Sequence, residues 1–310
     1  MKNKNEYLIL IVLILALGAY LYFKRTDQVH YQVPQLSEID TKKISRIEIV
    51  KKGRVLSLSQ KDGAWHIDPK GYPADKARVE KMLGHVGGLT LTDLVSESEN
   101  YTRYDLGPEE KITVKAFAGA SLSRSFDVGK AAPSSRHTYV MLPGDTHVYQ
   151  AKDSFRENFQ LGMNELRDRT VLEFSTDEIK KVAVTQGGRS VTLTRVEKAG
   201  QAEEPRAEPP AKQVVWTDDS GKEAAKADVD MLLSSLSKLE CGEFLEDSTR
   251  EGLTSPETKV TLSGTKEHTL SLHAKQGDKT PATSSKSPYV FALPDYRQEG
   301  ILKSIEALVK

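Results

Sequence analysis

The sequence predicts an α+β protein built from two tandem copies of one domain, preceded by an N-terminal transmembrane helix. In each copy, antiparallel strands are expected to pack against one main helix. Three observations predict this class. Similar blocks of sequence occur twice in the same order, each copy changes from strand-like to helix-like periodicity, and the chain begins with an uncharged apolar stretch.

The duplication rests on four pairs of blocks. A strand-like block at residues 44–65 returns at residues 179–216, and the helix-like VEKMLGHVGGL returns 150 residues later as VDMLLSSLSKL. The other pairs are LGPEEKITV with LTSPETKVTL, and YVMLPGD with YVFALPD. A repeat of this length is the size of an independent domain. We therefore expect one α+β domain at residues 40–174 and a second at residues 175–310.

The second copy contains an insertion at residues 199–213, AGQAEEPRAEPPAKQ. This segment is rich in Pro, Glu and Ala and lacks apolar periodicity, which is typical of chain that does not join a core. We expect a disordered-like, solvated loop between two strands, since long surface loops cost little stability. A partner-binding segment is the alternative interpretation.

The predicted membrane anchor occupies residues 1–30. The stretch from Tyr7 to Phe23 has 17 residues and no charge. At about 1.5 Å per residue it just spans a hydrocarbon core of roughly 30 Å, with help from its flanks. A cleaved secretion signal is the alternative, but no clear small-residue cleavage site follows. A short N-terminal tail before a large body favours a single-pass protein of the bacterial inner membrane, with its bulk on the periplasmic side.

The composition excludes some classes of function. The 44 Lys and Arg residues balance 44 Asp and Glu residues. Without a basic excess we expect no nucleic-acid partner. The single cysteine, Cys241, excludes an intrachain disulfide. It follows an apolar helix-like run, so we interpret it as a small buried residue, with a reactive thiol as the alternative.

In the first copy, strand-like elements come first. Residues 43–50 and 55–60 alternate around the turn Lys51-Lys52-Gly53, which predicts a β-hairpin. A third strand contains Trp65, whose counterpart in the second copy is Trp216. We interpret both indoles as core anchors because indole buries a large apolar area, and a ligand platform is the alternative.

A helix is expected at residues 74–89, with Asp75 as its N-cap. Its apolar residues share one face, which predicts packing on the sheet. Strands follow at residues 111–117 and 122–128. A second hairpin is predicted around Pro143-Gly144-Asp145, and a short helix at residues 154–161. The two equivalent apolar stripes are Val79, Met82, Leu83, Val86 and Leu89, and Val229, Leu232, Leu233, Leu236 and Leu239.

Several motifs of the first copy resemble the bacterial domain-of-unknown-function family 4340. They are Gly-x-Trp ending at Trp65, YDLG at residues 104–107, VGK at residues 128–130 and LRDRTVLEF at residues 166–174. The second copy is similar more faintly, because REGL stands in place of YDLG and VGK is missing. The resemblance implies a membrane-anchored envelope accessory role, often beside gliding-motility-type ABC transporter components. It implies no catalytic residues.

The sequence predicts no catalytic, cofactor-binding or metal-binding residues. His137 and His147 bracket one hairpin and suggest a metal pair, but further ligands are lacking nearby, so ordinary strand residues are the main interpretation. The segment Ser235-Leu236-Ser237-Lys238 matches the SxxK pattern of acyl enzymes without its companion motifs, which favours a chance match. The charged residues from Arg167 to Arg169, with Glu173, predict a salt-bridged connector or a partner-docking surface.

Three classes of function stay open from the sequence. The first is a membrane-anchored accessory or scaffold protein, which partners an ABC-type transporter or another envelope complex through its duplicated domains. The second is an envelope hydrolase with carboxylates that spacing does not reveal. The third is a glycan- or small-ligand-binding protein that uses Trp65 or Trp216 between the two copies. The lack of a catalytic motif favours the first class, and we expect no enzyme.

Overall fold

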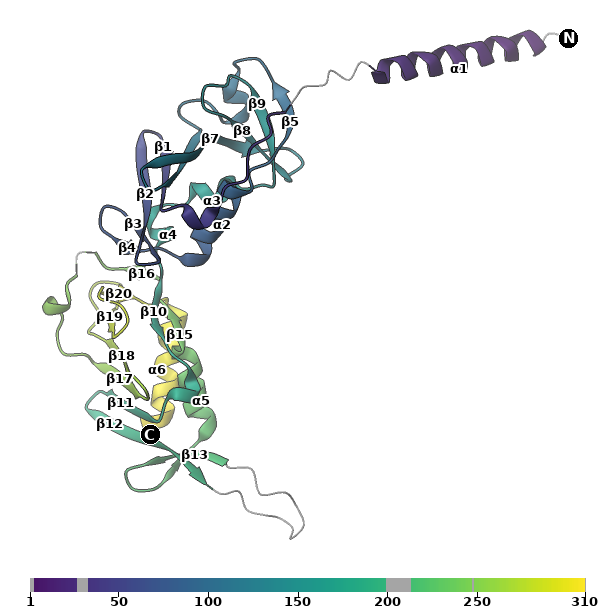
Figure 1. Cartoon of the computed structure of the whole chain (residues 1–310). Coiled ribbons are helices and arrows are strands. Elements are labelled where there is room, and N and C mark those ends of the chain that lie inside the picture. Colours follow the sequence, from purple (N-terminus) through teal and green to yellow (C-terminus); the bar gives the residue numbers. More distant parts are fainter. Residues whose placement is uncertain (1–2, 27–32, 199–212, 247, 310) are drawn as a thin grey trace. The chain divides into compact units, whose positions relative to one another are not determined.

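The computed structural model describes residues 3–26, 33–198, 213–246 and 248–309 (Figure 1). The chain forms two compact units, Met1–Arg167 and Asp168–Lys310, called unit 1 and unit 2 below. Unit 1 begins with the helix α1 (Asn3–Thr26). The predicted insertion at residues 199–213 lies outside the described residues, except for Gln213, which begins a strand.

The described part of unit 1 contains a nine-stranded antiparallel sheet with the strand order β4-β3-β2-β1-β6-β7-β8-β9-β5. Its strands are β1 (Arg46–Lys51), β2 (Arg54–Lys61), β3 (Ala64–Ile67), β4 (Tyr72–Pro73), β5 (Leu91–Ser96), β6 (Ile112–Ala118), β7 (Ser121–Ala131), β8 (His137–Met141) and β9 (Val148–Lys152). Its shorter helices are η1 (Thr41–Lys43), α2 (Lys76–Gly87), η2 (Tyr101–Tyr104), α3 (Arg156–Gln160) and α4 (Met163–Leu166).

The first strands confirm the predicted hairpin. Ile47 and Ile49 of β1 lie opposite Leu58 and Leu56 of β2, so the alternating apolar residues share one face. Lys52 and Gly53 both have positive φ values, 49° and 70°, as a tight two-residue hairpin turn requires.

Helix α2 begins where the sequence predicts. The carboxylate of Asp75 accepts a hydrogen bond from the main-chain N–H of Arg78 at 3.0 Å, which confirms Asp75 as the N-cap. Val79, Met82 and Val86 are fully buried along one stripe of the helix. The predicted packing stripe is therefore part of the core of unit 1.

The YDLG and VGK motifs meet in unit 1 and have a packing role. Asp105 adopts the left-handed conformation at the end of η2, and the next residue, Leu106, is buried. A Cβ atom on Gly129 would lie 2.3 Å from the carbonyl oxygen of Tyr104 and 2.9 Å from Cγ of Leu106. Only glycine permits this approach, because real Cβ atoms do not come so close to a backbone oxygen.

The described part of unit 2 repeats the arrangement, with a nine-stranded sheet in the order β14-β13-β12-β11-β17-β18-β19-β20-β16. The strands are β11 (Lys181–Gln186), β12 (Arg189–Lys198), β13 (Gln213–Asp218), β14 (Glu223–Ala224), β16 (Glu243–Phe244), β17 (Thr258–Ser263), β18 (Glu267–Leu272), β19 (Pro281–Ser284) and β20 (Phe291–Ala292). A separate ribbon pairs β10 (Thr170–Glu173) with β15 (Lys238–Glu240). The helices are η3 (Thr176–Glu178), α5 (Lys226–Leu236), η4 (Arg250–Gly252) and α6 (Asp295–Val309).

The units divide between residues 167 and 168, whereas the sequence places the boundary between residues 174 and 175. The difference comes from β10. Its residues Val171 and Leu172 are fully buried in the core of unit 2, and β10 pairs with β15. The segment before the first obvious hairpin of the second copy therefore belongs to that copy.

The predicted α+β class is wrong. The structure is mostly β, with two large antiparallel sheets, 39% strand and 27% helix. The size of the sheets accounts for the difference, because each unit has nine described strands in its large sheet, more than the sequence pattern showed. β4, β14, β16 and β20 have two residues each, which is too short for an alternating pattern to identify them.

The predicted transmembrane helix also requires correction. Within the described residues, no helix has the length and apolar character needed to cross a bilayer. The uncharged part of α1 has 17 residues. At about 1.5 Å per residue it covers about 25 Å, which falls short of a hydrocarbon core of roughly 30 Å.

Candidate functional site

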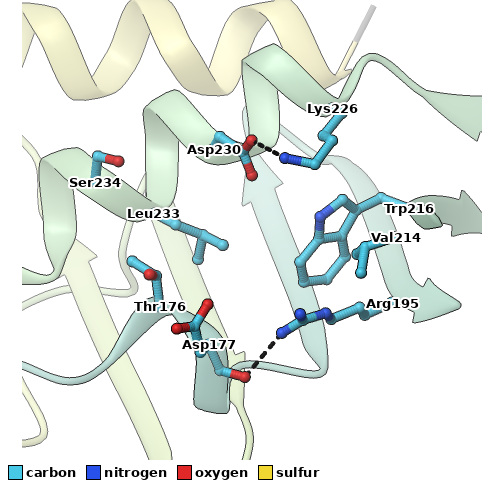
Figure 2. Close-up of a pocket in the computed structure, with 9 residues that line it drawn as sticks. All are labelled: Thr176, Asp177, Arg195, Val214, Trp216, Lys226, Asp230, Leu233 and Ser234. Atoms are coloured by element: carbon cyan, nitrogen blue, oxygen red, sulfur yellow. Dashed lines mark hydrogen bonds and ion pairs between the residues drawn. The ribbon is translucent and has the colours of Figure 1, made fainter. Parts of the chain in front are cut away.

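The candidate site is a hollow of about 370 Å³ in unit 2 (Figure 2). It lies between helix α5, the strands β12 and β13, and the short helix η3. Four charged, two hydroxyl and three apolar side chains line it, which makes it a mixed polar and apolar site. The lining residues are Thr176, Asp177, Arg195, Val214, Trp216, Lys226, Asp230, Leu233 and Ser234.

Sheet register and helix periodicity bring these residues together. Arg195 on β12 is the direct cross-strand partner of Trp216 on β13, so both side chains lie on one face of the sheet. On α5, Lys226 and Asp230 are four residues apart and therefore neighbours on the helix surface. Leu233 extends the same side of α5 over the sheet (Figure 2).

Two polar interactions order the rim of the hollow. The Lys226 ammonium forms an ion pair with the Asp230 carboxylate within α5. Nη1 of Arg195 donates a hydrogen bond to the main-chain oxygen of Asp177 at 2.8 Å. Among the described residues, neither the Arg195 guanidinium nor the Asp177 carboxylate forms a salt bridge with another side chain. The Arg195 guanidinium and the Asp177 carboxylate at the rim are therefore able to pair with charged groups of a ligand.

The floor of the hollow is apolar. Trp216 is only 2% exposed, and Leu233 is also buried. Trp65, the counterpart of Trp216 in unit 1, is 9% exposed. Both values confirm the interpretation of the two indoles as core anchors. Trp216 differs in that its ring also borders the hollow, with its nitrogen on the side toward α5 (Figure 2).

The arrangement is suited to recognition by charge and shape. It places a guanidinium, an ammonium and an indole N–H near two carboxylates and two hydroxyl groups. A ligand that enters the hollow meets hydrogen-bond donors and acceptors beside a small apolar floor, so the hollow is more polar than most small-molecule sites.

The sequence signals for this site are weak. The Lys226–Asp230 pair has a counterpart in unit 1, Lys76–Glu80, also four residues apart and paired at 3.8 Å. This repeated pair was a detectable signal that our sequence reasoning missed. Arg195 and Asp177 lie in different elements, and no local pattern connects them.

The two histidines that bracket the second hairpin do not face each other. His137 begins β8 and lies opposite Lys152, at the open end of the hairpin. His147 lies at the turn end, immediately before β9. Five residue positions along a strand separate them by about 16 Å. This separation excludes the alternative of a metal pair and agrees with the interpretation of both histidines as ordinary residues of the hairpin. In the described chain, no group of three or more His, Cys, Asp or Glu side chains is placed to hold a metal ion.

His147 instead belongs to a hydrogen-bonded cluster around Asp145. Oδ1 of Asp145 lies 2.5 Å from Nδ1 of His147, and Oδ2 accepts a hydrogen bond from the Tyr149 hydroxyl at 2.8 Å. Burial alone would raise the pKa of Asp145, but hydrogen bonds from His147 and Tyr149 outweigh it and lower that pKa. Burial, together with the Asp145 carboxylate, raises the pKa of Tyr149 to about 12.

The SxxK segment has no catalytic geometry. Ser235 lies in α5, where its hydroxyl donates to the main-chain oxygen of Leu232 at 2.7 Å, and Lys238 begins the strand β15. The two residues therefore do not share one helix turn, which the SxxK chemistry requires. Cys241 is 3% exposed, as expected of a small core residue.

The charged segment from Arg167 to Glu173 does not form one patch. Arg167 is 1% exposed, with its guanidinium 3.6 Å above the centre of the Tyr72 ring in unit 1. Asp168 accepts a hydrogen bond from the main-chain N–H of Thr170 at 2.8 Å, and Glu173 pairs with Lys286, both in unit 2. Arg167, Asp168 and Glu173 thus make separate local contacts within their own units.

The fold and the hollow define a mainly β protein with two tandem units and a candidate binding site in the second. The family described as Domain of unknown function (DUF4340) matches residues 65–256. This match covers more than half of the 310 residues, so the chain belongs to that family. The resemblance seen in the sequence is thereby confirmed, and the match includes every residue that lines the hollow.

Two further comparisons found no similar protein. No curated protein matches the chain. No solved structure matches it.

Proposed function

We propose that the protein is a bilayer-associated accessory or scaffold protein of the bacterial envelope, which acts by binding other proteins with its two units. The observation that carries this proposal is the apolar surface of α1. Eleven large apolar side chains of α1 are each more than half exposed: Tyr7, Ile9, Leu10, Ile11, Val12, Leu13, Ile14, Leu15, Leu17, Tyr20 and Leu21.

The distribution of these side chains favours lipid over a protein groove. Ile9 to Leu15 are seven consecutive apolar residues, which at 3.6 residues per turn point in every direction around the helix. A protein groove covers one side of a helix, whereas a bilayer takes up apolar side chains without a complementary surface. Burial of one such side chain contributes about 1.5–3 kcal/mol, so the surface of α1 supplies ample driving force for association with a bilayer.

The proposal includes a location, the inner membrane, and a partner, another protein of the envelope. The resemblance of the sequence to membrane-anchored envelope proteins supports a place at the bacterial inner membrane, with both units on the periplasmic side. The resemblance to proteins encoded beside ABC transporter components supports a transporter or another envelope complex as the partner. In unit 2, Met231 and Tyr296 are 60% and 70% exposed on the neighbouring helices α5 and α6. Met and Tyr are enriched at protein interfaces, which supports action by contact and no catalysis.

Cell fractionation tests the membrane part of this proposal. Membranes from cells that produce the full chain are washed with high salt and then with alkaline carbonate. We expect the wild-type protein to stay in the pellet, and the triple variant Leu10→Glu, Leu13→Glu, Leu17→Glu to be released. A variant with Val55→Glu and Leu122→Glu, which changes exposed apolar residues outside α1, is the matched control and should stay bound. Wild-type protein in the supernatant of the salt wash would refute the proposal.

The hollow of unit 2 favours a second candidate function, the binding of a small ligand. Its apolar floor, its two hydroxyl groups and its unpaired charges at Arg195 and Asp177 support this role. The two functions are compatible, because the hollow and the apolar surface of α1 lie in different units.

A further inference from the structure

We propose that the hollow of unit 2 binds a small zwitterion, a ligand that carries an ammonium and a carboxylate group close together, as an amino acid or a short peptide does. This inference rests on the small-ligand function above and names the class of ligand. It does not depend on α1 or on a protein partner.

Trp216 supplies an indole N–H to the hollow. The residue is 98% buried, since only 2% of its surface is exposed. Among the described residues, none accepts a hydrogen bond from this N–H. The nitrogen itself is not one of the fully buried polar atoms that lack a partner in the described chain, so the N–H opens to the hollow. Since Trp216 borders the hollow, a ligand oxygen placed there would satisfy the indole.

The guanidinium of Arg195 also borders the hollow. It donates one N–H to the main-chain oxygen of Asp177, and this carbonyl group is neutral. The positive charge of Arg195 therefore has no counterion among the described side chains. Arginine presents five N–H donors in a planar fork that matches a carboxylate. Arg195 and Trp216 are cross-strand partners that both border the hollow; the guanidinium points toward Asp177, and the indole nitrogen lies on the side toward α5 (Figure 2).

The two carboxylates of the hollow differ in their pairing. The Asp230 carboxylate is compensated by Lys226 within α5. The Asp177 carboxylate makes no salt bridge in the described part of the chain and lies on the opposite side of the hollow from Trp216 (Figure 2). An ammonium group on the ligand would pair with Asp177 while the ligand carboxylate pairs with Arg195. Asp177 is exposed and Arg195 is half-buried, so a ligand with both charges would gain a charge-assisted contact at each side chain, whereas a ligand of one sign would gain only one.

The size of the hollow limits the ligand. A volume of about 370 Å³ accommodates a small molecule. Such sites range over about 300–1,000 Å³, so this hollow is at the lower end. The floor of Val214, Trp216 and Leu233 adds contact with a short apolar side chain.

Unit 1 provides an internal comparison. The pairing of β1 with β2 matches that of β11 with β12, so Gln60 corresponds to Arg195. The short helix η1 corresponds to η3, so Lys42 corresponds to Asp177. Unit 1 thus lacks both the guanidinium and the carboxylate, although it keeps the lysine–acid pair on its helix. We expect the zwitterion site in unit 2 alone.

The test uses the two tryptophans as separate reporters. The full chain in detergent, with ¹⁵N in the indole rings, has two indole N–H resonances, from Trp65 and Trp216. Trialanine is titrated as the probe, and its N-acetylated and C-amidated forms serve as charge-deleted controls. We expect a saturable shift of the Trp216 resonance and an unchanged Trp65 resonance. Blocking either terminus should weaken binding about tenfold or more, because each block removes a charge-assisted hydrogen bond.

Matched variants assign the two charges. Arg195→Gln installs the residue that unit 1 has, and Asp177→Asn removes the carboxylate; each should weaken binding about tenfold. Gln60→Ala is the control in unit 1 and should leave binding unchanged. The Trp65 and Trp216 resonances report whether each variant is folded. If both blocked peptides bind as well as trialanine, or if no probe shifts Trp216, the zwitterion site is refuted. A shift with N-acetylglucosamine alone refutes the ligand class but keeps the small-ligand function.

Discussion

Replacement of Gly129 by Ala tests whether the two family motifs of unit 1 act through close packing. The added Cβ would lie 2.3 Å from the carbonyl oxygen of Tyr104 and 2.9 Å from Cγ of Leu106. The first contact is to backbone, so η2 or β7 must move to relieve it. Overpacking of this kind costs about 1–3 kcal/mol. We expect the free energy of unfolding of unit 1 to fall by this amount.

Scanning calorimetry of the full chain measures the effect, with the transition of unit 2 as an internal reference. For a domain of this size, each kcal/mol lowers the melting temperature by roughly 2–8 °C. Gly84→Ala is the matched control, because a Cβ there meets no atom within 4 Å and the residue lies inside α2. We expect that control to stabilise unit 1 by about 0.5–1 kcal/mol. If Gly129→Ala is as stable as the wild type, the packing explanation of YDLG and VGK is wrong.

Two further predictions concern unit 1. The pKa of Tyr149 is raised from its ordinary value to about 12, so its contribution to stability is present at neutral pH and is lost as the pH rises toward that value. We therefore expect an alkaline loss of stability that is smaller in Tyr149→Phe, measured by urea unfolding as a function of pH; equal losses in both proteins would contradict the Asp145–Tyr149 contact. The guanidinium of Arg124 donates to the carbonyl oxygens of Val86 and Gly87 at the end of α2, and to that of Ser37. Arg124→Met should destabilise unit 1 by about 1–3 kcal/mol and speed amide exchange in residues 33–40, and unchanged exchange there would show that Arg124 does not hold this segment.

Local sequence patterns predicted the local structure well. The alternation of Ile47 and Ile49, the turn at Lys52 and Gly53, and the cap at Asp75 depend on neighbouring residues, so a single sequence shows them. The two-residue strands β4, β14, β16 and β20 are too short to show a period. β10 was assigned to the wrong copy because its partner, β15, lies far along the chain.

The candidate site was harder to predict than the fold. Arg195 and Asp177 are 18 residues apart and meet because the β11–β12 hairpin returns the chain to η3. Trp216 was visible as a repeated indole, but only the structure shows that its buried ring borders a hollow. His137 and His147 bracket one hairpin in the sequence, and the strand register places them at opposite ends of it. Spacing alone does not give register, which explains these differences.

Site-specific photo-crosslinking in native membranes tests most directly whether the units work by contact. A photoreactive residue replaces Tyr296 or Met231 on the exposed helices of unit 2, and a third protein carries it at the fully buried Phe291 as the control. We predict a discrete adduct of larger mass, with the same partner protein from both exposed positions and none from Phe291. Illumination that yields no protein adduct from either exposed position, at native expression, would contradict the account.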